Sequence, residues 1–529
     1  MTKAMKRIQI FDSTLRDGAQ GEGISYSVTD KLNIVRALDD FGVDYIEAGN
    51  PASNPKDMAF FEKAGQEKLH HAKLCAFGAT HRKGITADKD PGLKSLLDAG
   101  TPCVSIFGKT WDLHVEKILR ATPEENLALI FDTVKFMKDN GREVIFDAEH
   151  FFDGFIHNEA YALSALEAAL SAGADLLCLC DTNGGTLPGL IKDIVETVIA
   201  RFPAAAIGIH CHNDTGCAVA SSIAAVEAGA VQVQGTFVGT GERCGNADLS
   251  IIIPNLRFKM GLQCAGDDLT GLARTVRHIC DISNIRVYKS KPYVGESAFA
   301  HKGGMHIDGV HKVSASFEHI DPTLVGAARR FLMSEVSGRT TVMKKLEQVA
   351  PDLKRDSPEV AKILETLKDL ESRGYQFEAA DASFELMALK TLGRFHPHFR
   401  PVIYRTSGEY PPPAGERSAS AILSLEVDDK EETTAAMGNG PVNALDNALR
   451  KALKVFYPEL DVVRLSDYKV RVLSGAQATA AKVRVLIEST DGDIIWNTVG
   501  VGTDVVAASW EALCDSLEYI LHTRREKLQ

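Results

Sequence analysis

The chain, which is 529 residues long, has no excess of basic side chains. Its formal net charge at pH 7 is −12. Proteins that neutralise nucleic-acid phosphates carry a basic surplus, so this composition argues against a nucleic-acid partner. No segment approaches eighteen consecutive apolar residues, and no apolar stretch follows the basic residues at positions 3, 6 and 7. We therefore expect a soluble, cytoplasmic protein that does not bind membranes.

The sequence also lacks any CxxC pair, although it contains 10 cysteines. They are scattered, and some lie inside apolar runs, as Cys178 and Cys180 do. This distribution suits a reduced compartment and argues against a thiolate zinc site. The remaining composition, 45% hydrophobic and 25% charged, is that of a globular protein with room for two or three domains.

A repeated pattern fills residues 8–262, in which a helical segment ends at glycine and passes into a β-branched apolar run. Gly42, Gly100, Gly173 and Gly229 hold this position, where a left-handed residue commonly follows a helix. Strands that alternate with helices predict a parallel sheet. We place the strands at 8–12, 44–47, 73–78, 102–107, 143–148, 175–180, 206–210 and 231–236.

Eight such units over about 250 residues predict a closed (β/α)8 TIM barrel. An open doubly wound sheet is the alternative, but no glycine-rich dinucleotide turn follows the first strand. Polar residues gather at the strand ends that form the catalytic face of such a barrel. They are Asp12, Arg16 and Asp17, then Glu47, Glu149, His150, Asp181, Thr182, Asn183, His210 and His212, and the segment 241–246.

His210 and His212 lie two residues apart on a strand, so both side chains face the barrel mouth and Cys211 faces away. A carboxylate ends the first strand, and a polar amide follows the eighth. Two imidazoles and a carboxylate suit one divalent cation, Mg²⁺, Mn²⁺, Co²⁺ or Zn²⁺. Arg16 could neutralise an oxyanion beside that cation, and a surface ion pair with Asp17 is the alternative.

The rest of the chain predicts two further regions. We expect a helix at 267–285, a glycine-rich loop at 299–309 that closes over the barrel mouth, and an amphipathic helix at 340–373. A loop at 410–415 precedes alternating strands at 420–427, 482–488 and 494–499. The predicted domains are a catalytic barrel at 1–265, a helical linker and lid at 266–375, and an α+β domain at 376–529.

The C-terminal domain contains an internal repeat. Glycines 438 and 440 open a helix at 442–456, and glycines 500 and 502 open another at 504–521. Two strand groups that each lead into a helix predict a duplicated β-β-β-α module. Both helix N-termini could hold a carboxylate, and the alternative is that the glycines only make tight turns.

Four segments resemble the signatures of the α-isopropylmalate, homocitrate and citramalate synthases: residues 13–18, 210–214, 241–246 and 301–306. The similarity runs nearly end to end, and the C-terminal module resembles the regulatory domain of that family. Residues 20–25, 45–57 and 148–153 look most like the long citramalate synthases. Asn50-Pro51-Ala52 stands where that type carries Trp-Pro-Gly.

This resemblance implies a metal-dependent acyltransferase that condenses acetyl-CoA with pyruvate and water to give (R)-citramalate and CoA, the first step of a pyruvate route to isoleucine. The alternative acceptor is 2-oxoisovalerate, which gives 2-isopropylmalate. A metal-dependent lyase would use the same barrel face, but such lyases generally lack the C-terminal module. An amino-acid sensor without catalytic activity would need only residues 410–529.

The resemblance also implies roles for individual residues at the metal. Asp17, His210 and His212 hold the divalent cation, and Asn246 is a further ligand or orients one. Arg16 faces the developing negative charge. Glu47 is either a structural ion-pair partner of that arginine or a member of the site.

The implied substrate-binding and acid–base residues come from both ends of the catalytic region. Thr182 donates to the carboxylate of the 2-oxo acid, and Glu149 and His306 are the acid–base candidates. Asp308 positions His306 and contributes to substrate binding. For control, we expect a homodimer whose C-terminal domain binds an amino-acid effector, isoleucine, and is thereby feedback-inhibited.

Overall fold

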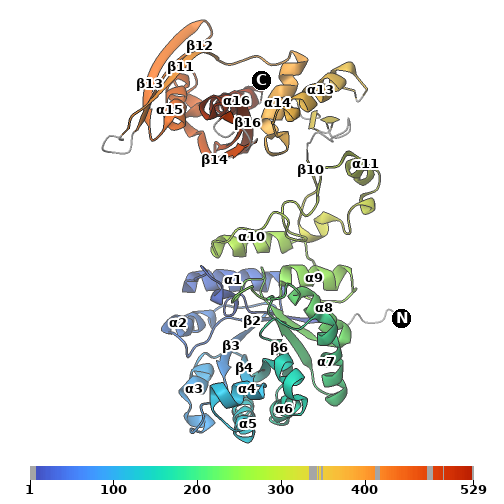
Figure 1. Cartoon of the computed structure of the whole chain (residues 1–529). Coiled ribbons are helices and arrows are strands. Elements are labelled where there is room, and N and C mark those ends of the chain that lie inside the picture. Colours follow the sequence, from blue (N-terminus) through green and yellow to red (C-terminus); the bar gives the residue numbers. More distant parts are fainter. Residues whose placement is uncertain are drawn as a thin grey trace. The chain divides into compact units, whose positions relative to one another are not determined.

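The computed structural model of the chain describes residues 7–332, 342–343, 345–346, 349–354, 356–410, 418–473, 480–492 and 494–526 (Figure 1). Two compact units divide it. The first consists of Met1–Phe299 with His319–Arg329, and the second consists of Ala300–Glu318 with Arg330–Gln529.

The first unit contains the predicted barrel, in which eight parallel strands close in sequence order and β1 pairs with both β2 and β8. The apolar runs of the sequence form these strands because both faces of a barrel strand are buried. Each strand lies within two residues of its predicted range. The strands are β1 Gln9–Asp12, β2 Tyr45–Glu47, β3 Lys73–Ala79, β4 Cys103–Lys109, β5 Glu143–Glu149, β6 Leu176–Asp181, β7 Ile207–Cys211 and β8 Gln232–Gly235.

Helices surround the strands, and α1, α2, α3, α5 and α9 begin at a residue whose side chain caps the helix. Ser27 and Thr122 each form a capping box, and Gly42 ends the first helix with a φ of 88°. The helices are α1 Val28–Phe41, α2 Pro55–Ala64, α3 Pro91–Asp98, α4 Asp112–His114, α5 Pro123–Asp139, α6 Phe151–Ser171, α7 Pro188–Arg201, α8 Ala218–Ala228, α9 Leu249–Phe258 and α10 Leu272–Ile282. Helix α10 confirms the helix predicted at 267–285, and it packs against α1 of the barrel.

The core of this unit has two layers. The inner faces of the strands fill the barrel with a small cluster that includes Phe11, Tyr45 and Cys178. The outer faces and the helices enclose a much larger apolar layer, to which Ile10, Ile46 and Cys211 belong. Because the interior is filled, the polar residues at the strand ends lie at the mouth of a packed core.

The second unit begins with β9 Ala300–His301, which pairs in parallel with β10 Arg330–Phe331. Two sequence predictions for this region are wrong. The segment 299–309 is not one loop, because helix α11 Gly304–Lys312 begins inside it. Nor is 340–373 one helix: the described residues between 351 and 357 are not helical, and α13 Pro358–Ser372 begins only at the Ser357 cap, with proline at its first position. Helix α14 Asp381–Leu392 follows.

The C-terminal residues form the predicted duplicated α+β module. The first copy contains β11 Arg400–Gly408, β12 Ala419–Val427, β13 Lys430–Gly438 and α15 Pro441–Leu453, and the second contains β14 Arg464–Val472, β15 Val483–Thr490, β16 Ile495–Gly502 and α16 Val505–Glu526. Each copy is an antiparallel three-stranded sheet in sequence order. Of the loop predicted at 410–415, only Tyr410 lies within the described residues.

Close packing explains two of the repeat's glycines. A Cβ atom on Gly438 would lie 2.4 Å from the backbone nitrogen of Ala444, and one on Gly500 would lie 2.0 Å from the carbonyl oxygen of Ala508. Each glycine therefore lets a strand approach the helix of its own module. Among the described helices, none is long and apolar enough to cross a membrane.

Candidate metal and active site at the barrel mouth

Three buried side chains that are far apart in the sequence converge at the barrel mouth. The Nε2 atoms of His210 and His212 lie 3.3 Å and 3.7 Å from Oδ2 of Asp17. One ligand atom from each residue lies within 4.8 Å of the other two. Strand β7 presents both imidazoles on one face, and Asp17 follows the tip of β1. This arrangement has the size and the donor types of a divalent-cation site.

Asn246 adjoins this cluster through a backbone bridge to His212. Its Nδ2 donates to the carbonyl oxygen of Thr240 at 3.1 Å, which leaves Oδ1 buried and without a hydrogen bond to any described residue. Gly241 makes room for the amide, because a Cβ there would lie 2.1 Å from Nδ2. A buried carbonyl oxygen without a donor costs free energy unless something else coordinates it. The residues therefore fit a bound cation.

The charges of the cluster also fit. Burial by itself would raise the pKa of Asp17, but Arg16 and then His210 lower it far below its usual range. Burial and the neighbouring His210 lower the pKa of His212 to about 4. Burial acts to lower the pKa of His210, but Asp17 raises it above its usual value. An ionised carboxylate and neutral imidazoles are the forms that bind metal ions, so a bound cation would displace the proton that Asp17 favours on His210.

Arg16 lies at the edge of the mouth, held from two sides. Its Nε donates to Oε2 of Glu47 at 2.6 Å, and its guanidinium carbon lies 3.8 Å from the ring centroid of Phe77. Glu47 is fully buried and also accepts a hydrogen bond from the hydroxyl of Ser13. Glu47 is therefore the ion-pair partner of Arg16, whose Nη1 lies 3.5 Å from Asp17, and its second oxygen, Oε1, is buried without a hydrogen bond to any described residue.

The ends of β5 and β6 place two further predicted residues on the same face. Thr182 Oγ1 accepts from the backbone nitrogen of His150 at 2.9 Å, so its hydroxyl hydrogen can point to a ligand. Glu149 forms an ion pair with Lys109 at the end of β4. Sequence reasoning missed Lys109, and the available signal was a basic residue just beyond the predicted strand 102–107. The structure pairs it with Glu149 in the register of β4 against β5.

A cluster of rings in which Trp111 and His114 contact His150 was also missed. Trp111 stacks on His114, and His114 lies 4.3 Å from His150 between ring centroids. His150 has a left-handed backbone with a φ of 56°, and its Nδ1 lies 3.1 Å from Asp153. Such strain in a residue other than glycine is often found at functional sites. The sequence signal was an aromatic residue and an imidazole just beyond a strand end.

A second group of possible ligands, Asp147, Cys178 and Cys180, lies buried inside the barrel. Oxygens of Asp147 accept from Ser105 at 2.6 Å and from Gln234 at 3.1 Å. Burial, and then the nearby Glu47, raise the pKa of Asp147 to about 6. Since hydrogen bonds within the protein already satisfy this carboxylate, the group is a polar layer of the core.

His306 and Asp308 belong to the second unit, where both lie on α11. His306 is exposed and its ring stacks on Phe317, with 4.2 Å between the centroids. Asp308 forms an ion pair with Lys312 at 2.6 Å, one turn further along the helix. His306 and Asp308 are thus positioned by a separate helix. The other predicted site residues all lie on the barrel: Arg16, Asp17, Glu149, Thr182, His210, His212 and Asn246.

Known protein families match the whole length of this architecture. Residues 7–284 match the family described as HMGL-like, residues 293–375 match the homocitrate synthase post-HMGL domain-like family, and residues 378–521 match the LeuA allosteric (dimerisation) domain. The first match covers more than half of the chain.

Individual relatives are similar over almost their full length. The chain is 49% identical to "(R)-citramalate synthase" from Geobacter sulfurreducens, and 49% identical to the protein of the same name from Aquifex aeolicus, with 99% of each chain covered in both cases. A probable 2-isopropylmalate synthase from Methanopyrus kandleri is 32% identical over 98% of this chain and 99% of its own length. The chain therefore belongs to the HMGL-like family and, within it, groups with the (R)-citramalate synthases.

Proposed function

We propose that this protein condenses acetyl-CoA with pyruvate and water to give (R)-citramalate and CoA. The observation that carries the proposal is the 49% identity to two (R)-citramalate synthases over 99% of the chain. Two 2-isopropylmalate synthases, from Methanopyrus kandleri (named as probable) and Methanocaldococcus jannaschii, are 32% and 30% identical to this chain. Pyruvate is therefore favoured over 2-oxoisovalerate as the acceptor.

The barrel mouth is the proposed site of this reaction. Asp17, His210 and His212 would hold one divalent cation, Mg²⁺, Mn²⁺, Co²⁺ or Zn²⁺, and Asn246 would be a further ligand or orient one. The bound cation supplies Lewis-acid polarisation of the acceptor's ketone. Because Glu47 occupies only one edge of the Arg16 guanidinium, the other nitrogens can stabilise the oxyanion that develops during carbon–carbon bond formation.

Other residues would orient the acceptor and move protons. Thr182 donates to the carboxylate of the 2-oxo acid. Glu149 or His306 takes a proton from the methyl group of acetyl-CoA, and the resulting carbanion attacks the ketone carbon. Asp308 positions His306 and contacts substrate, and water finally cleaves the thioester to release CoA.

The three segments predicted from the sequence serve as the proposed domains: a catalytic barrel at 1–265, a linker and lid at 266–375, and a regulatory domain at 376–529. We place an amino-acid effector, isoleucine, in the last of these, where the helix N-termini after Gly440 and Gly502 could receive its carboxylate. The reaction would then be the feedback-inhibited first step of isoleucine synthesis from pyruvate.

A homodimer is the proposed assembly. The sheets of the C-terminal modules expose apolar side chains, among them Ile403, Ile422, Val470 and Val472, each at least 44% exposed. Apolar surface of this kind on a soluble domain commonly marks an interface, and two-fold dimers are the commonest way to cover it. The match to a dimerisation domain over the same residues supports this assembly.

The acceptor can be tested by steady-state kinetics. Release of CoA from acetyl-CoA is measured with pyruvate and, separately, with 2-oxoisovalerate, and the product is identified by mass spectrometry. We expect kcat/KM to be higher for pyruvate and the product to be citramalate. A higher kcat/KM for 2-oxoisovalerate would contradict the proposal and favour 2-isopropylmalate synthesis.

A further inference from the structure

The second unit contains a cavity that the proposed reaction and its control do not use. Its volume is about 370 Å³, and it lies among α13, α14, β16 and α16. Leu370, Phe377, Met387 and Val499 form its apolar walls. Cavities of this size with mostly apolar walls and a few polar groups are typical small-molecule sites.

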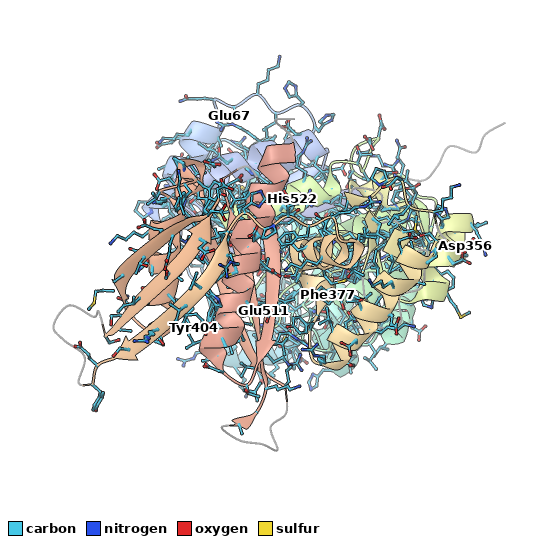
Figure 2. All side chains as sticks on the ribbon, turned by 90° about the horizontal axis from the view of Figure 1, so that it is seen from above. Glu67, Asp356, Phe377, Tyr404, Glu511 and His522 are labelled. Atoms are coloured by element: carbon cyan, nitrogen blue, oxygen red, sulfur yellow. The ribbon has the colours of Figure 1, made fainter. Side chains whose placement is uncertain are left out.

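Two carboxylates mark the polar end of this cavity. Glu511 and Asp515 lie one turn apart on α16, so their side chains share a face of the helix. Figure 2 labels Glu511 on that helix and Phe377, which precedes α14, and both residues line the cavity. Burial raises the pKa of both carboxylates, as expected for acidic groups that have lost part of their hydration.

The protein satisfies these carboxylates only in part. Asp515 accepts from the Nζ of Lys390 at 2.9 Å and from the hydroxyl of Ser383 at 3.1 Å. Glu511 accepts from the hydroxyl of Tyr375 at 2.6 Å and from the backbone nitrogen of Val501 at 3.2 Å. Two oxygens offer about four lone-pair sites, so each carboxylate can accept further hydrogen bonds.

The charge of the lining selects the ligand. Glu511 and Asp515 give two negative charges and Lys390 gives one positive charge, so a cation in the cavity would restore neutrality. A primary ammonium has three donors and can reach two carboxylates at once. We propose that this cavity binds a small apolar molecule through a primary ammonium group placed between Glu511 and Asp515.

Lys390 indicates where such a ligand meets solvent, because 46% of its side chain is exposed. An α-amino acid could place its carboxylate against this lysine, and a simple amine would leave the lysine with Asp515. Both have the ammonium and the apolar body that the cavity calls for. The test therefore includes one probe of each kind.

An occupant of this cavity would contact two regions that match different families. Leu370 and Tyr375 lie in the part that matches the post-HMGL domain, and Met387 and Glu511 lie in the part that matches the LeuA domain. A bound ligand would thus tie α13 to α16. This site is separate from the helix N-termini after Gly440 and Gly502, so it does not depend on the control proposed there.

Isothermal titration calorimetry of the full-length chain tests the proposal with three probes. They are isoleucine, 2-methylbutylamine, which lacks its carboxylate, and 3-methylpentanoate, which lacks its ammonium. We expect the amine to bind and the acid not to bind. If isoleucine binding is also weakened in the cavity variants below, the ligand class includes amino acids, and if only amine binding responds to them, the ligand is a simple amine. Failure of the amine to bind at millimolar concentration would overturn the proposal.

Variants then locate the binding. Glu511→Gln keeps the shape of the side chain and one acceptor oxygen, which can hold the hydrogen bond from the Val501 backbone nitrogen while the amide nitrogen donates to the Tyr375 hydroxyl. It should weaken amine binding at least tenfold because the charge is gone. Leu370→Trp keeps both carboxylates but fills the cavity, and it should abolish binding. Glu365→Gln is the matched control, since this residue is exposed on α13 and does not line the cavity. Equal amine affinity in the wild-type, Glu511→Gln and Leu370→Trp proteins would refute the assignment.

The amine probe keeps this result distinct from the proposed isoleucine control. Inhibition of the wild-type enzyme by isoleucine that persists in both cavity variants would leave that control intact, whatever the amine does. Amine binding that is lost in both variants would support the cavity site even if isoleucine proved not to inhibit.

Discussion

At the scale of single residues, the barrel mouth depends on how Arg16 is held. Glu47 binds one edge of the guanidinium and Phe77 covers one face, so the remaining nitrogens point to the side of Asp17. A lysine has neither the planar group that stacks on Phe77 nor a second edge to offer after pairing with Glu47. Arg16 therefore pairs with Glu47, stacks on Phe77 and directs further N–H groups to the side of Asp17. A lysine ammonium cannot do all three.

Arg16→Lys should accordingly lower kcat by at least about 10²-fold, the scale of one lost oxyanion donor. The fold should persist, as measured by circular dichroism and the thermal midpoint. Arg7→Lys is the matched control, because Arg7 is a partly exposed ion-pair partner of Asp44 outside the site, and its activity should be unchanged. If Arg16→Lys retained most of the activity, Arg16 would be an ion-pair partner and nothing more.

Removal of the cation should abolish turnover and leave the barrel folded, because the barrel core is apolar packing rather than the metal cluster. Exhaustive chelation followed by activity and circular dichroism measurements tests this, and re-addition of a divalent cation should restore activity. Full activity of a metal-free preparation would rule out a catalytic metal.

Asn246→Ala should weaken cation binding about 10–100-fold, the effect expected when a residue that orients a metal ligand is removed. Titration calorimetry with the cation measures this change. Asn183→Ala, an exposed amide on the same barrel face, is the control and should bind the cation as the wild type does. Equal affinities in the two variants would remove Asn246 from the site.

Much of this site could be predicted from residue types and strand ends, but not the partners that hold it. The two histidines follow from their spacing of two residues, and the carboxylates follow from the strand tips. The ion pair of Lys109 with Glu149 depends on the register of β4 against β5, which no local pattern reports. The orphaned oxygen of Asn246 depends on a turn through Gly241 that brings the amide back toward His212.

At the scale of elements, the barrel strands were predictable because each is a buried apolar run between polar ends. Strands β11, β13 and β14 were not among the predicted strands. All three are edge strands whose side chains are mostly exposed, so they lack the buried apolar run that marks a strand of the barrel. The π-helical turn at Val115–Leu119 was not predicted either, and it directly follows the short helix where Trp111 and His114 stack.

Asp39 links two elements of the barrel and gives a test at this scale. Its buried carboxylate, at the end of α1, accepts from the backbone nitrogens of His70, His71 and Ala72 at 2.7–2.8 Å, just before β3. Burial acts to raise its pKa, but these three donors lower it below the usual value. Asp39→Asn should reduce the free energy of unfolding by about 1–3 kcal/mol at pH 7.

The pH dependence of that difference follows from the lowered pKa. The folded state favours the ionised carboxylate, so the stabilisation is complete above the unfolded-state pKa and is lost as pH falls through the lower, folded-state pKa. Urea denaturation of the two proteins between neutral and acidic pH measures it. Asp40→Asn, at the exposed neighbouring position, should change stability little at any pH. A constant difference between wild type and Asp39→Asn across this range would contradict the assignment.

At the scale of the whole molecule, the chain joins a barrel unit to a unit that carries the duplicated module. The barrel and the C-terminal module could be predicted because each repeats a local pattern, eight times in the barrel and twice in the module. The division into units could not, since it depends on α10 packing against α1, a contact between residues more than two hundred positions apart.

A truncated chain tests the proposed control. The cut belongs after Gly393, the residue that ends α14, because a cut near 409 would leave β11 without its partner β12. We expect this fragment to keep the cation site, measured as unchanged cation affinity, and to lose inhibition by isoleucine. If isoleucine inhibited the fragment and the full chain equally, the effector would act outside residues 394–529.

The alternation along β7 has a consequence for how this sequence can change by insertion and deletion. His210 and His212 face the mouth and Cys211 faces the apolar layer, because successive side chains of a strand point to opposite faces. Deleting a single residue from the start of β7 would reverse this alternation, turning both imidazoles into the apolar layer and the thiol into the mouth. Insertions or deletions within β7 therefore keep both imidazoles at the mouth only if they add or remove an even number of residues. The loops that follow the barrel helices can change by any number of residues.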